Sequence, residues 1–310
     1  MKRFLILVGA VLAFAAATTA PAGAGSVAAG ASAYCGDDLF DSVSALSPAS
    51  TARGASREPV FRNAPVDSTI PGLAPKVPAN FSASVPVYIH VIHNGTTGNV
   101  SAAAINEQMA VLNLAFSGFY GGANSKISFT LAGVDRTNNA LWFDAEPESA
   151  EELAMKTALK QGGPTALNIY TTSGAQDFFL GWAYYPSITV QNKNSVLDGV
   201  VLHWGSLPGG PFGSAFSLGQ TATHESGHWL GLAHTFEGGC KGKGDGIGDT
   251  PAMFEPTSGC PLGKDTCPAQ PGLDPIHNYM DYSFDSCYEE FTTDQVGRMQ
   301  QQWLHWRLKR

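Results

Sequence analysis

The chain has 310 residues, a length that accommodates one large domain with additional segments. Its apolar fraction of 44% is usual for a protein that builds a hydrophobic core. The formal net charge is −8, and the basic residues form no extended stripe that would displace counterions from a phosphate backbone. We therefore expect no nucleic-acid partner.

The first 24 residues have the pattern of a secretory signal peptide. Lys2 and Arg3 precede an apolar run over residues 4–17, and small residues at 22–24 offer a cleavage site. The apolar run is too short to cross a bilayer comfortably, which argues against the alternative of a membrane anchor. We expect a secreted, extracellular protein without a membrane span.

Residues 25–80 differ in composition from the rest of the chain. They are rich in Ala, Ser, Pro and Gly and lack the apolar runs that a core requires. This composition favours a pro-segment or linker over a folded unit. The ordered domain is accordingly predicted over residues 81–310.

Strands alternate with helices in the first part of this domain. A β-rich run ends at Asn94-Gly95, Ser101 can cap a helix, and Pro147 precedes a second helix that ends at Gly162. Such alternation favours a sheet backed by helices. The predicted elements are a strand over 85–92, a helix over 101–116, a strand over 127–134, a helix over 148–161, and strands over 166–170 and 200–204.

Residues 236–290 show no sustained period and are dense in Gly, Pro and Asp. Cys240, Cys260, Cys267 and Cys287 fall in or beside this stretch, and four clustered cysteines in a secreted chain predict two disulfides. The sequence alone leaves three pairings open. A structural zinc site is the alternative, and the absence of a CxxC pair disfavours it.

A final helix is predicted to begin near residue 292. Residues 292–295, Thr-Thr-Asp-Gln, fit a capping box. The helix that follows presents an apolar stripe of Val296, Met299, Trp303 and Trp306.

Residues 224–234, His-Glu-Ser-Gly-His-Trp-Leu-Gly-Leu-Ala-His, concentrate the chemistry of the chain. A helix would direct the rings of His224 and His228 at one metal ion, with Glu225 beside them rather than among the ligands. His234 can join them only if the helix ends, and Gly231 can adopt the positive φ that turns the chain back. The alternative is an ordinary amphipathic helix whose histidines are core or surface residues.

Three neutral imidazoles are typical of a catalytic Zn²⁺ site, because they leave the fourth position open for water. Glu225 would take the proton of this zinc-bound water and pass it to the leaving amine. The sequence therefore predicts a zinc-dependent endopeptidase for peptide or protein substrates, and we expect a monomer. One alternative is a binding module without turnover, which would usually have lost the base or a ligand. Another is a zinc hydrolase that acts on a different class of substrate.

The eleven residues resemble the metzincin signature, and residues 278–282, Asn-Tyr-Met-Asp-Tyr, are similar to the Met-turn of that group. Residues 238–240, 248–251, 287 and 291–292 narrow the resemblance to the pappalysin family, in its compact ulilysin-like branch. The resemblance covers residues 80–310 and is dense from residue 199 onward. It implies an α+β metzincin catalytic domain divided by a cleft. The upper subdomain (81–231) would hold a twisted mixed sheet with helices, and the lower subdomain (232–310) would be irregular, disulfide-bonded and closed by a C-terminal helix.

The resemblance also implies roles for single residues. Met280 would support the three histidines from below, and the Tyr282 phenol would donate a hydrogen bond to the developing oxyanion, with a packing tyrosine as the alternative. Residues 200–204 would be the edge strand that receives substrate as an added antiparallel strand. Asp285 would favour Arg or Lys after the scissile bond. The implied disulfides are Cys240–Cys267 and Cys260–Cys287.

Two further expectations concern calcium and latency. Family members carry Ca²⁺, and Asp245, Asp249 and the Thr250 carbonyl would supply oxygen ligands, although these residues can equally form a capped turn. The Cys35 thiolate would occupy the open zinc position and keep a precursor latent, as in several metzincins. The match is partial, because Ala33 stands where an arginine often precedes that cysteine. A free or intermolecularly paired thiol is the alternative.

Overall fold

The computed structural model describes residues 75–177, 179–189, 195–241 and 244–308. The predicted signal peptide, most of the predicted pro-segment and Cys35 lie outside the described residues. Within the described ranges, no helix is both long and apolar enough to cross a bilayer.

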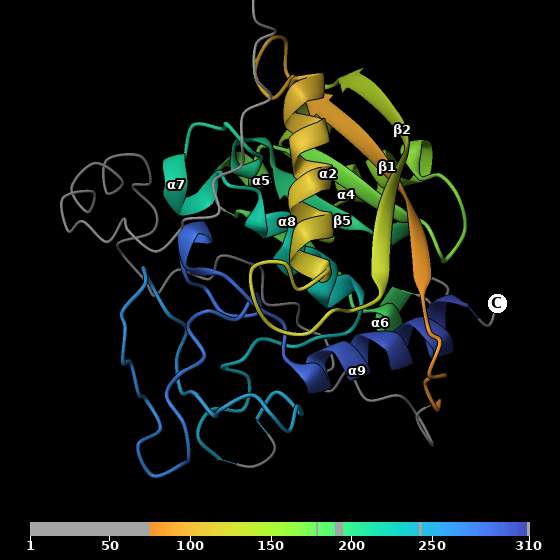
Figure 1. The fold of residues 1–310 in the computed structure, drawn as a ribbon. Helices are drawn as coiled ribbons and strands as arrows, with labels where there is room; N and C mark the ends of the chain where they lie inside the picture. Colours follow the sequence, from red (N-terminus) through yellow and green to blue (C-terminus); the bar gives the residue numbers. More distant parts are fainter. Residues whose placement is uncertain (1–74, 178, 190–194, 242–243, 309–310) are drawn as a thin grey trace, which may run out of the picture. The chain divides into compact units, whose positions relative to one another are not determined.

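A five-stranded sheet organises the first half of the described chain, in the order β2-β1-β3-β5-β4 (Figure 1). Its neighbouring strands are parallel, except that β4 pairs antiparallel with β5. This mixed sheet confirms the predicted α+β class. The strands are β1 (Ala83–His93), β2 (Ile127–Asn138), β3 (Leu167–Thr172), β4 (Gly181–Ala183) and β5 (Val200–His203).

The prediction that residues 200–204 form the edge strand is wrong. β5 lies inside the sheet, where Leu202 faces Thr171 of β3 on one side and Gly181 of β4 on the other. The edge strand next to β5 is therefore β4. It has three residues, too few to show the alternation by which a strand is recognised in a sequence.

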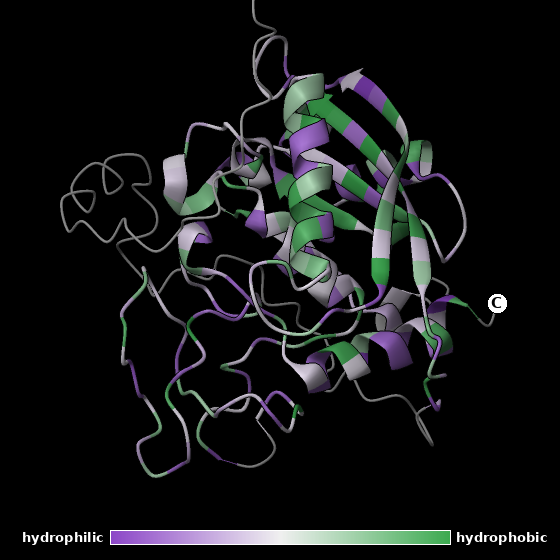
Figure 2. Cartoon of the chain, viewed as in Figure 1, coloured by the Kyte–Doolittle hydropathy of each residue, from purple (hydrophilic) through white to green (hydrophobic). Residues whose placement is uncertain are grey.

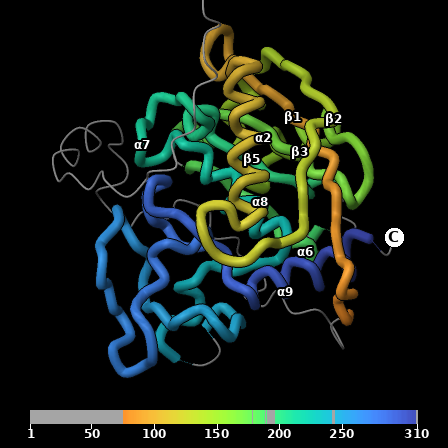
Figure 3. The backbone as a smooth tube through the Cα atoms, viewed as in Figure 1, coloured from red at the N-terminus to blue at the C-terminus, as the bar shows by residue number. Residues whose placement is uncertain are grey.

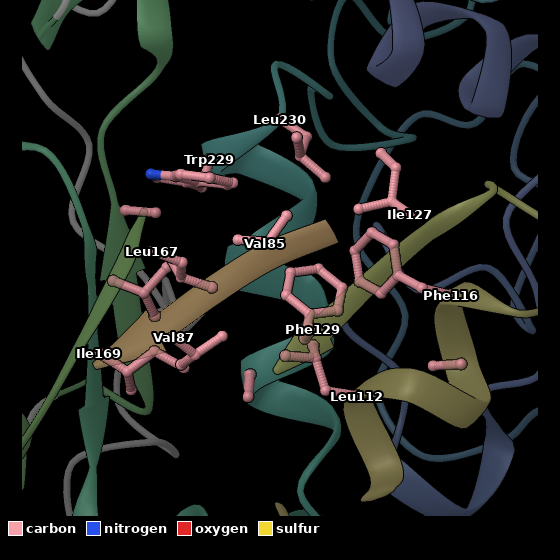
Figure 4. Packing of buried hydrophobic residues seen from close by; sticks show 14 of the residues in the cluster. Val85, Val87, Leu112, Phe116, Ile127, Phe129, Leu167, Ile169, Trp229 and Leu230 are labelled. Atoms are coloured by element: carbon pink, nitrogen blue, oxygen red, sulfur yellow. The ribbon is translucent and has the colours of Figure 1, made fainter. Parts of the chain in front are cut away.

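Helices α2 (Ala102–Phe116) and α8 (Gln220–Trp229) pack on one face of the sheet. Ser101 begins α2 as predicted, because its side chain accepts a hydrogen bond from the Ala104 amide at 3.1 Å. Apolar side chains from both helices and from the strands meet in one cluster, shown in Figure 4. It includes Val85, Val87, Leu112, Phe116, Ile127, Phe129, Leu167, Ile169, Trp229 and Leu230.

The short helix α3 (Ala140–Phe143) and helix α4 (Ala150–Leu159) contribute to a second cluster with the alternate strand residues. The helix predicted from residue 148 begins later, because Glu148 has a left-handed φ of 60° and Ser149 is the cap. The ion pair between Lys156 and Glu152 is fully buried, at 2.8 Å. Trp182 and Tyr184 also donate hydrogen bonds to the Glu152 carboxylate, which offsets the loss of its hydration.

The chain after α8 is largely irregular, as predicted, until α9 (Thr293–Gln302) (Figure 3). Disulfides join Cys240 to Cys267 and Cys260 to Cys287, the pairing that the resemblance implies. The predicted capping box is present at Thr292. Figure 2 shows α9 banded with hydrophobic and hydrophilic residues, as its buried stripe requires. The shorter elements are α5 (Gly174–Asp177), α6 (Pro186–Thr189), η2 (Ser195–Leu197), η3 (Trp204–Ser206), α7 (Gly213–Phe216), η4 (Asp285–Cys287) and the π-helical turn η5 (Trp303–Arg307).

Candidate active site

Helix α8 carries the first two histidines and ends where the sequence predicts. The Nε2 atoms of His224 and His228 lie 3.1 Å apart, one helical turn from each other. Gly231 has a φ of 87°, and its amide donates to the His228 carbonyl at 2.8 Å. A Cβ at Gly231 would also lie 2.7 Å from the Gln302 side chain. Both the backbone and the packing therefore require glycine at this turn.

The turn brings His234 back to the same point in space. Its Nε2 lies 3.1 Å from Nε2 of His228, so three ring nitrogens converge. A tetrahedral zinc ion with Zn–N bonds of about 2.0–2.1 Å separates its ligand nitrogens by about 3.3 Å. The donor set therefore fits a zinc ion held by His224, His228 and His234.

Main-chain carbonyls orient two of the rings. His224 Nδ1 donates to the Tyr279 carbonyl at 2.5 Å, and His228 Nδ1 donates to the Leu232 carbonyl at 2.7 Å. With the proton on Nδ1, each Nε2 presents a lone pair to the shared point. Such lone pairs repel one another unless a cation lies between them, which also supports a metal site.

Met280 lies directly beneath α8 and is fully buried. A Cβ at Gly227 would lie 2.4 Å from the Met280 sulfur, so the glycine between the two histidines makes room for this side chain. The Met280 carbonyl accepts a hydrogen bond from the Thr235 amide at 3.2 Å, beside His234. Met280 thus packs against both segments that carry the histidines.

A pocket adjoins the histidines and brings the other predicted residues together. Glu225 is 1% exposed, and a Cβ at Gly181 of β4 would lie 2.9 Å from its Oε1. The Tyr282 ring lies 5.0 Å from the His234 ring and 5.7 Å from the His224 ring, between centroids. The residues that line the pocket are Leu180, Thr221, His224, Glu225, Tyr282, Asp285 and Tyr288.

Asp285 has a structural contact that the sequence did not reveal. Its carboxylate accepts hydrogen bonds from the Leu218 amide at 2.9 Å and the Gln220 amide at 3.3 Å. These amides lie at the start of α8, where the N-cap residue Gly219 has no side chain to offer. A glycine in this position was a signal that the cap comes from elsewhere in the chain.

The residues expected to bind calcium take part in two different sets of hydrogen bonds. The Asp245 carboxylate accepts from the Thr250 hydroxyl at 2.9 Å and from the Ile247 amide at 3.0 Å. Asp249 accepts from the Asp294 amide at 3.0 Å, at the start of α9. Burial raises the pKa of Asp245 to about 6. These contacts describe a capped turn, and calcium stays a prediction.

Known proteins resemble this chain over most of the described residues. Residues 168–303 match the model of the peptidase M43 family, described as pregnancy-associated plasma protein-A. An extracellular metalloprotease of Neurospora crassa is 46% identical over 233 residues, which cover 74% of this chain and 78% of the relative. The chain belongs to the pappalysin family. It is a zinc metalloendopeptidase, and the extracellular location of its relatives confirms the predicted secretion.

A second extracellular metalloprotease and two solved structures are also similar to this chain in sequence, and the structures are similar to it in fold. An extracellular metalloprotease of Pyricularia oryzae is 47% identical over 227 residues, 72% of this chain and 76% of the relative. Mature mirolysin of Tannerella forsythia, solved in complex with a cleaved peptide, is 30% identical with a TM-score of 0.60, over 71% of this chain and 90% of mirolysin. A promirolysin mutant is 31% identical with a TM-score of 0.63, over 74% and 83% of the two chains.

Proposed function

We propose that this pappalysin hydrolyses peptide bonds at the pocket beside His224, His228 and His234, with Glu225 as the general base. The convergence of three ring nitrogens next to a buried carboxylate carries the proposal. A zinc ion bound by the histidines would polarise the scissile carbonyl and lower the pKa of the attacking water.

Glu225 accepts the proton of the attacking water and then donates it to the leaving amine. Its burial against Gly181 keeps the carboxylate out of bulk water and beside the three histidines. Tyr282 projects toward the same histidines and donates a hydrogen bond to the oxyanion as the carbonyl is attacked.

The substrate binds as an extended peptide along β4, the edge strand of the sheet beside Glu225. Asp285 lines the pocket and favours a basic side chain after the scissile bond, although its carboxylate also accepts hydrogen bonds from the start of α8. The cleaved peptide in the mirolysin structure supports a peptide substrate.

Latency and calcium complete the proposal. The chain is made as a latent precursor in which residues 25–80 precede the catalytic domain. The Cys35 thiolate would occupy the open position of a zinc ion bound by the three histidines. The existence of a promirolysin form in the family supports a precursor. Replacing Cys35 with Ala in a precursor whose processing is blocked then raises peptidase activity. If the precursor with Ala at position 35 is as inactive as the unmutated precursor, Cys35 does not cause the latency. The ionised Asp245 carboxylate, with Asp249 and Thr250, is the calcium ligand set.

The test of the catalytic assignment is Glu225→Gln. Peptide hydrolysis should fall by about 10²- to 10⁴-fold, because proton transfer is lost while the histidines are untouched. A peptide library read by mass spectrometry measures cleavage, and zinc content is measured on the same sample. Glu107→Gln, an exposed carboxylate on α2, is the control and should leave both unchanged. Near-normal turnover by zinc-loaded Glu225→Gln would refute the assignment.

A further inference from the structure

The short element α5 is a left-handed turn. Gly174, Ala175, Gln176 and Asp177 have φ values of 62°, 56°, 59° and 65° in succession. In this conformation the Cβ of an L-residue crowds the following carbonyl oxygen, so three of the four residues are strained. Strain of this kind persists only where the surroundings hold it, and it concentrates at functional sites.

Hydrogen bonds close the turn from within. The Asp177 amide donates to the Ser173 carbonyl at 2.7 Å, and the Phe179 amide donates to the Gly174 carbonyl at 2.8 Å. A Cβ at Gly174 would lie 2.0 Å from the Phe179 oxygen and 2.9 Å from the His203 ring. The turn is therefore compact and lies against His203.

The His203 side chain holds the exposed end of the turn. Its Nδ1 accepts from the Gly205 amide at 2.8 Å, so the ring proton lies on Nε2, which donates to Asp177 Oδ1 at 2.6 Å. His203 is buried, whereas the Asp177 side chain is 77% exposed. Burial lowers the pKa of His203, which favours this neutral tautomer near neutral pH.

The same histidine also holds the chain just before β4. Its amide donates to the Leu180 carbonyl at 2.7 Å, and Leu180 lines the pocket that contains Glu225. Gly181 follows, and a Cβ added there would lie 2.9 Å from Oε1 of Glu225. His203 thus fixes two points of the chain that leads from the left-handed turn into β4.

We propose that the His203–Asp177 contact is a latch that positions β4 for substrate binding. Asp177 is a positioning residue, since it acts on the peptide only through the edge strand. With the latch intact, the strained turn is held in place and β4 is preorganised to receive an extended peptide. Without it, the turn can relax and β4 loses its fixed register. The inference rests on the proposed function of β4 in binding peptides.

Asp177→Ala tests the latch, with Asp177→Asn as the conservative variant that keeps an oxygen acceptor. For an extended peptide, Asp177→Ala should raise KM about fivefold and leave kcat within about twofold, as expected for the loss of one partly exposed charge-assisted hydrogen bond. Asp177→Asn should restore most of the binding. Glu148→Ala is the matched control, because Glu148 is another exposed acidic residue with a φ of 60°, at the start of α4 rather than β4.

Hydrogen exchange provides a readout that does not depend on turnover. The His203 amide, which donates to Leu180, should exchange on the order of tenfold faster in Asp177→Ala and remain unchanged in Glu148→Ala. Unchanged exchange in Asp177→Ala, or a KM increase of the same size in Glu148→Ala, would overturn the latch. A wild-type protein that cleaves no peptide would instead refute the proposed function, and the exchange comparison would still decide whether the latch exists.

Discussion

The two sides of the active site are stabilised by different means. On the sheet side, a continuous apolar cluster joins β1, β2, β3 and β5 to α2 and α8, and it extends to Met280, Phe291 and Met299 in the chain after α8. The rest of the irregular side, after α8, has two disulfides and side chains that satisfy main-chain groups, such as Asp281 with the Thr257 amide at 3.0 Å. The ring nitrogens that converge thus come from both sides, two from helix α8 and one from the segment that follows the turn at Gly231.

Specific contacts connect the two sides. The Tyr279 carbonyl orients His224, Met280 fills the space left by Gly227, and Asp285 caps the start of α8. Each contact comes from the irregular side and acts on the helix. The sheet side therefore supplies the position of α8, and the irregular side supplies part of the orientation of its rings.

The largest effect is expected at Arg307, where the C-terminal turn η5 packs against Asp198 and Trp229 of the sheet side. Its guanidinium donates to the Trp229 carbonyl at 2.7 Å and to Asp198 at 3.1 Å, and lies 3.4 Å from the centre of the Trp229 ring. Arg307→Met leaves the buried Asp198 without its main cation and should lower the free energy of unfolding by about 3–5 kcal/mol. Thermal denaturation measures the loss. Arg298→Met, which removes a more exposed contact to Gly246, should cost less than about 1 kcal/mol; equal losses would contradict the comparison.

The second effect concerns the irregular side. Replacing Cys260 and Cys287 with Ser opens a loop with a sequence separation of 27 residues, which should cost about 3.5 kcal/mol by the loop-entropy estimate. Because the disulfide ends beside Asp285, we expect weaker zinc binding while the amides of β1 and β3 stay protected from hydrogen exchange. Competition with a chelator measures zinc affinity, and hydrogen exchange measures the protection of the β1 and β3 amides. Equal deprotection of both sides would show that they are not stabilised separately.

Local sequence signals predicted the elements that depend on local physics. Ser101, Gly231 and Thr292 mark helix ends in the structure as their side chains or backbone freedom suggested. The spacing of the histidines was enough to predict that their rings converge, because one helix and the turn after it determine where the rings lie. The helix start near residue 148 was misplaced, since the sequence does not show that Glu148 adopts a left-handed conformation.

What the sequence could not supply are contacts between residues far apart in the chain. β4 is a strand only because it pairs with β5, and its three residues show no pattern of their own. The cap that Asp285 provides and the contact of Arg307 with Asp198 join segments separated by dozens of residues. The pairing of the disulfides came from the family resemblance, because spacing alone left three choices.

A smaller effect is expected at the joint between α8 and the irregular segment. Gly231→Ala places a Cβ at a φ of 87°, at a cost of roughly 1–2 kcal/mol, in addition to the overlap with Gln302. Gly297→Ala is the matched control, because its Cβ would meet nothing within 4 Å inside α9 and should stabilise the helix by about 0.5–1 kcal/mol. Thermal denaturation should shift in opposite directions, and a loss in both variants would refute the argument.

The smallest effect is a pH dependence on the irregular side. Burial raises the pKa of Asp245 from 3.8 to about 6, against the opposing hydrogen bonds of Ile247 and Thr250 and the charge of Arg298. The folded state therefore binds a proton more tightly than the unfolded state, so this group favours folding as pH falls through 6 toward 3.8 and disfavours it above 6. Without calcium, Asp245→Asn should raise the thermal midpoint slightly at pH 7.5, raise it less at pH 5, and leave it unchanged only below pH 3.8, where both states of the wild type are protonated.

The response of the thermal midpoint to added Ca²⁺ distinguishes a calcium site at Asp245 from a capped turn, because bound calcium would make the ionised carboxylate stabilising. Because a cation favours the ionised carboxylate, added Ca²⁺ should raise the wild-type midpoint at pH 7.5, where Asp245 is ionised, and raise it less at pH 5, where a proton competes. Asp245→Asn should lose the calcium response at pH 7.5, and Asp249→Asn should weaken it. A calcium shift that is the same at both pH values, or that survives Asp245→Asn, would place any bound calcium elsewhere and leave the Asp245–Thr250 contact as a turn.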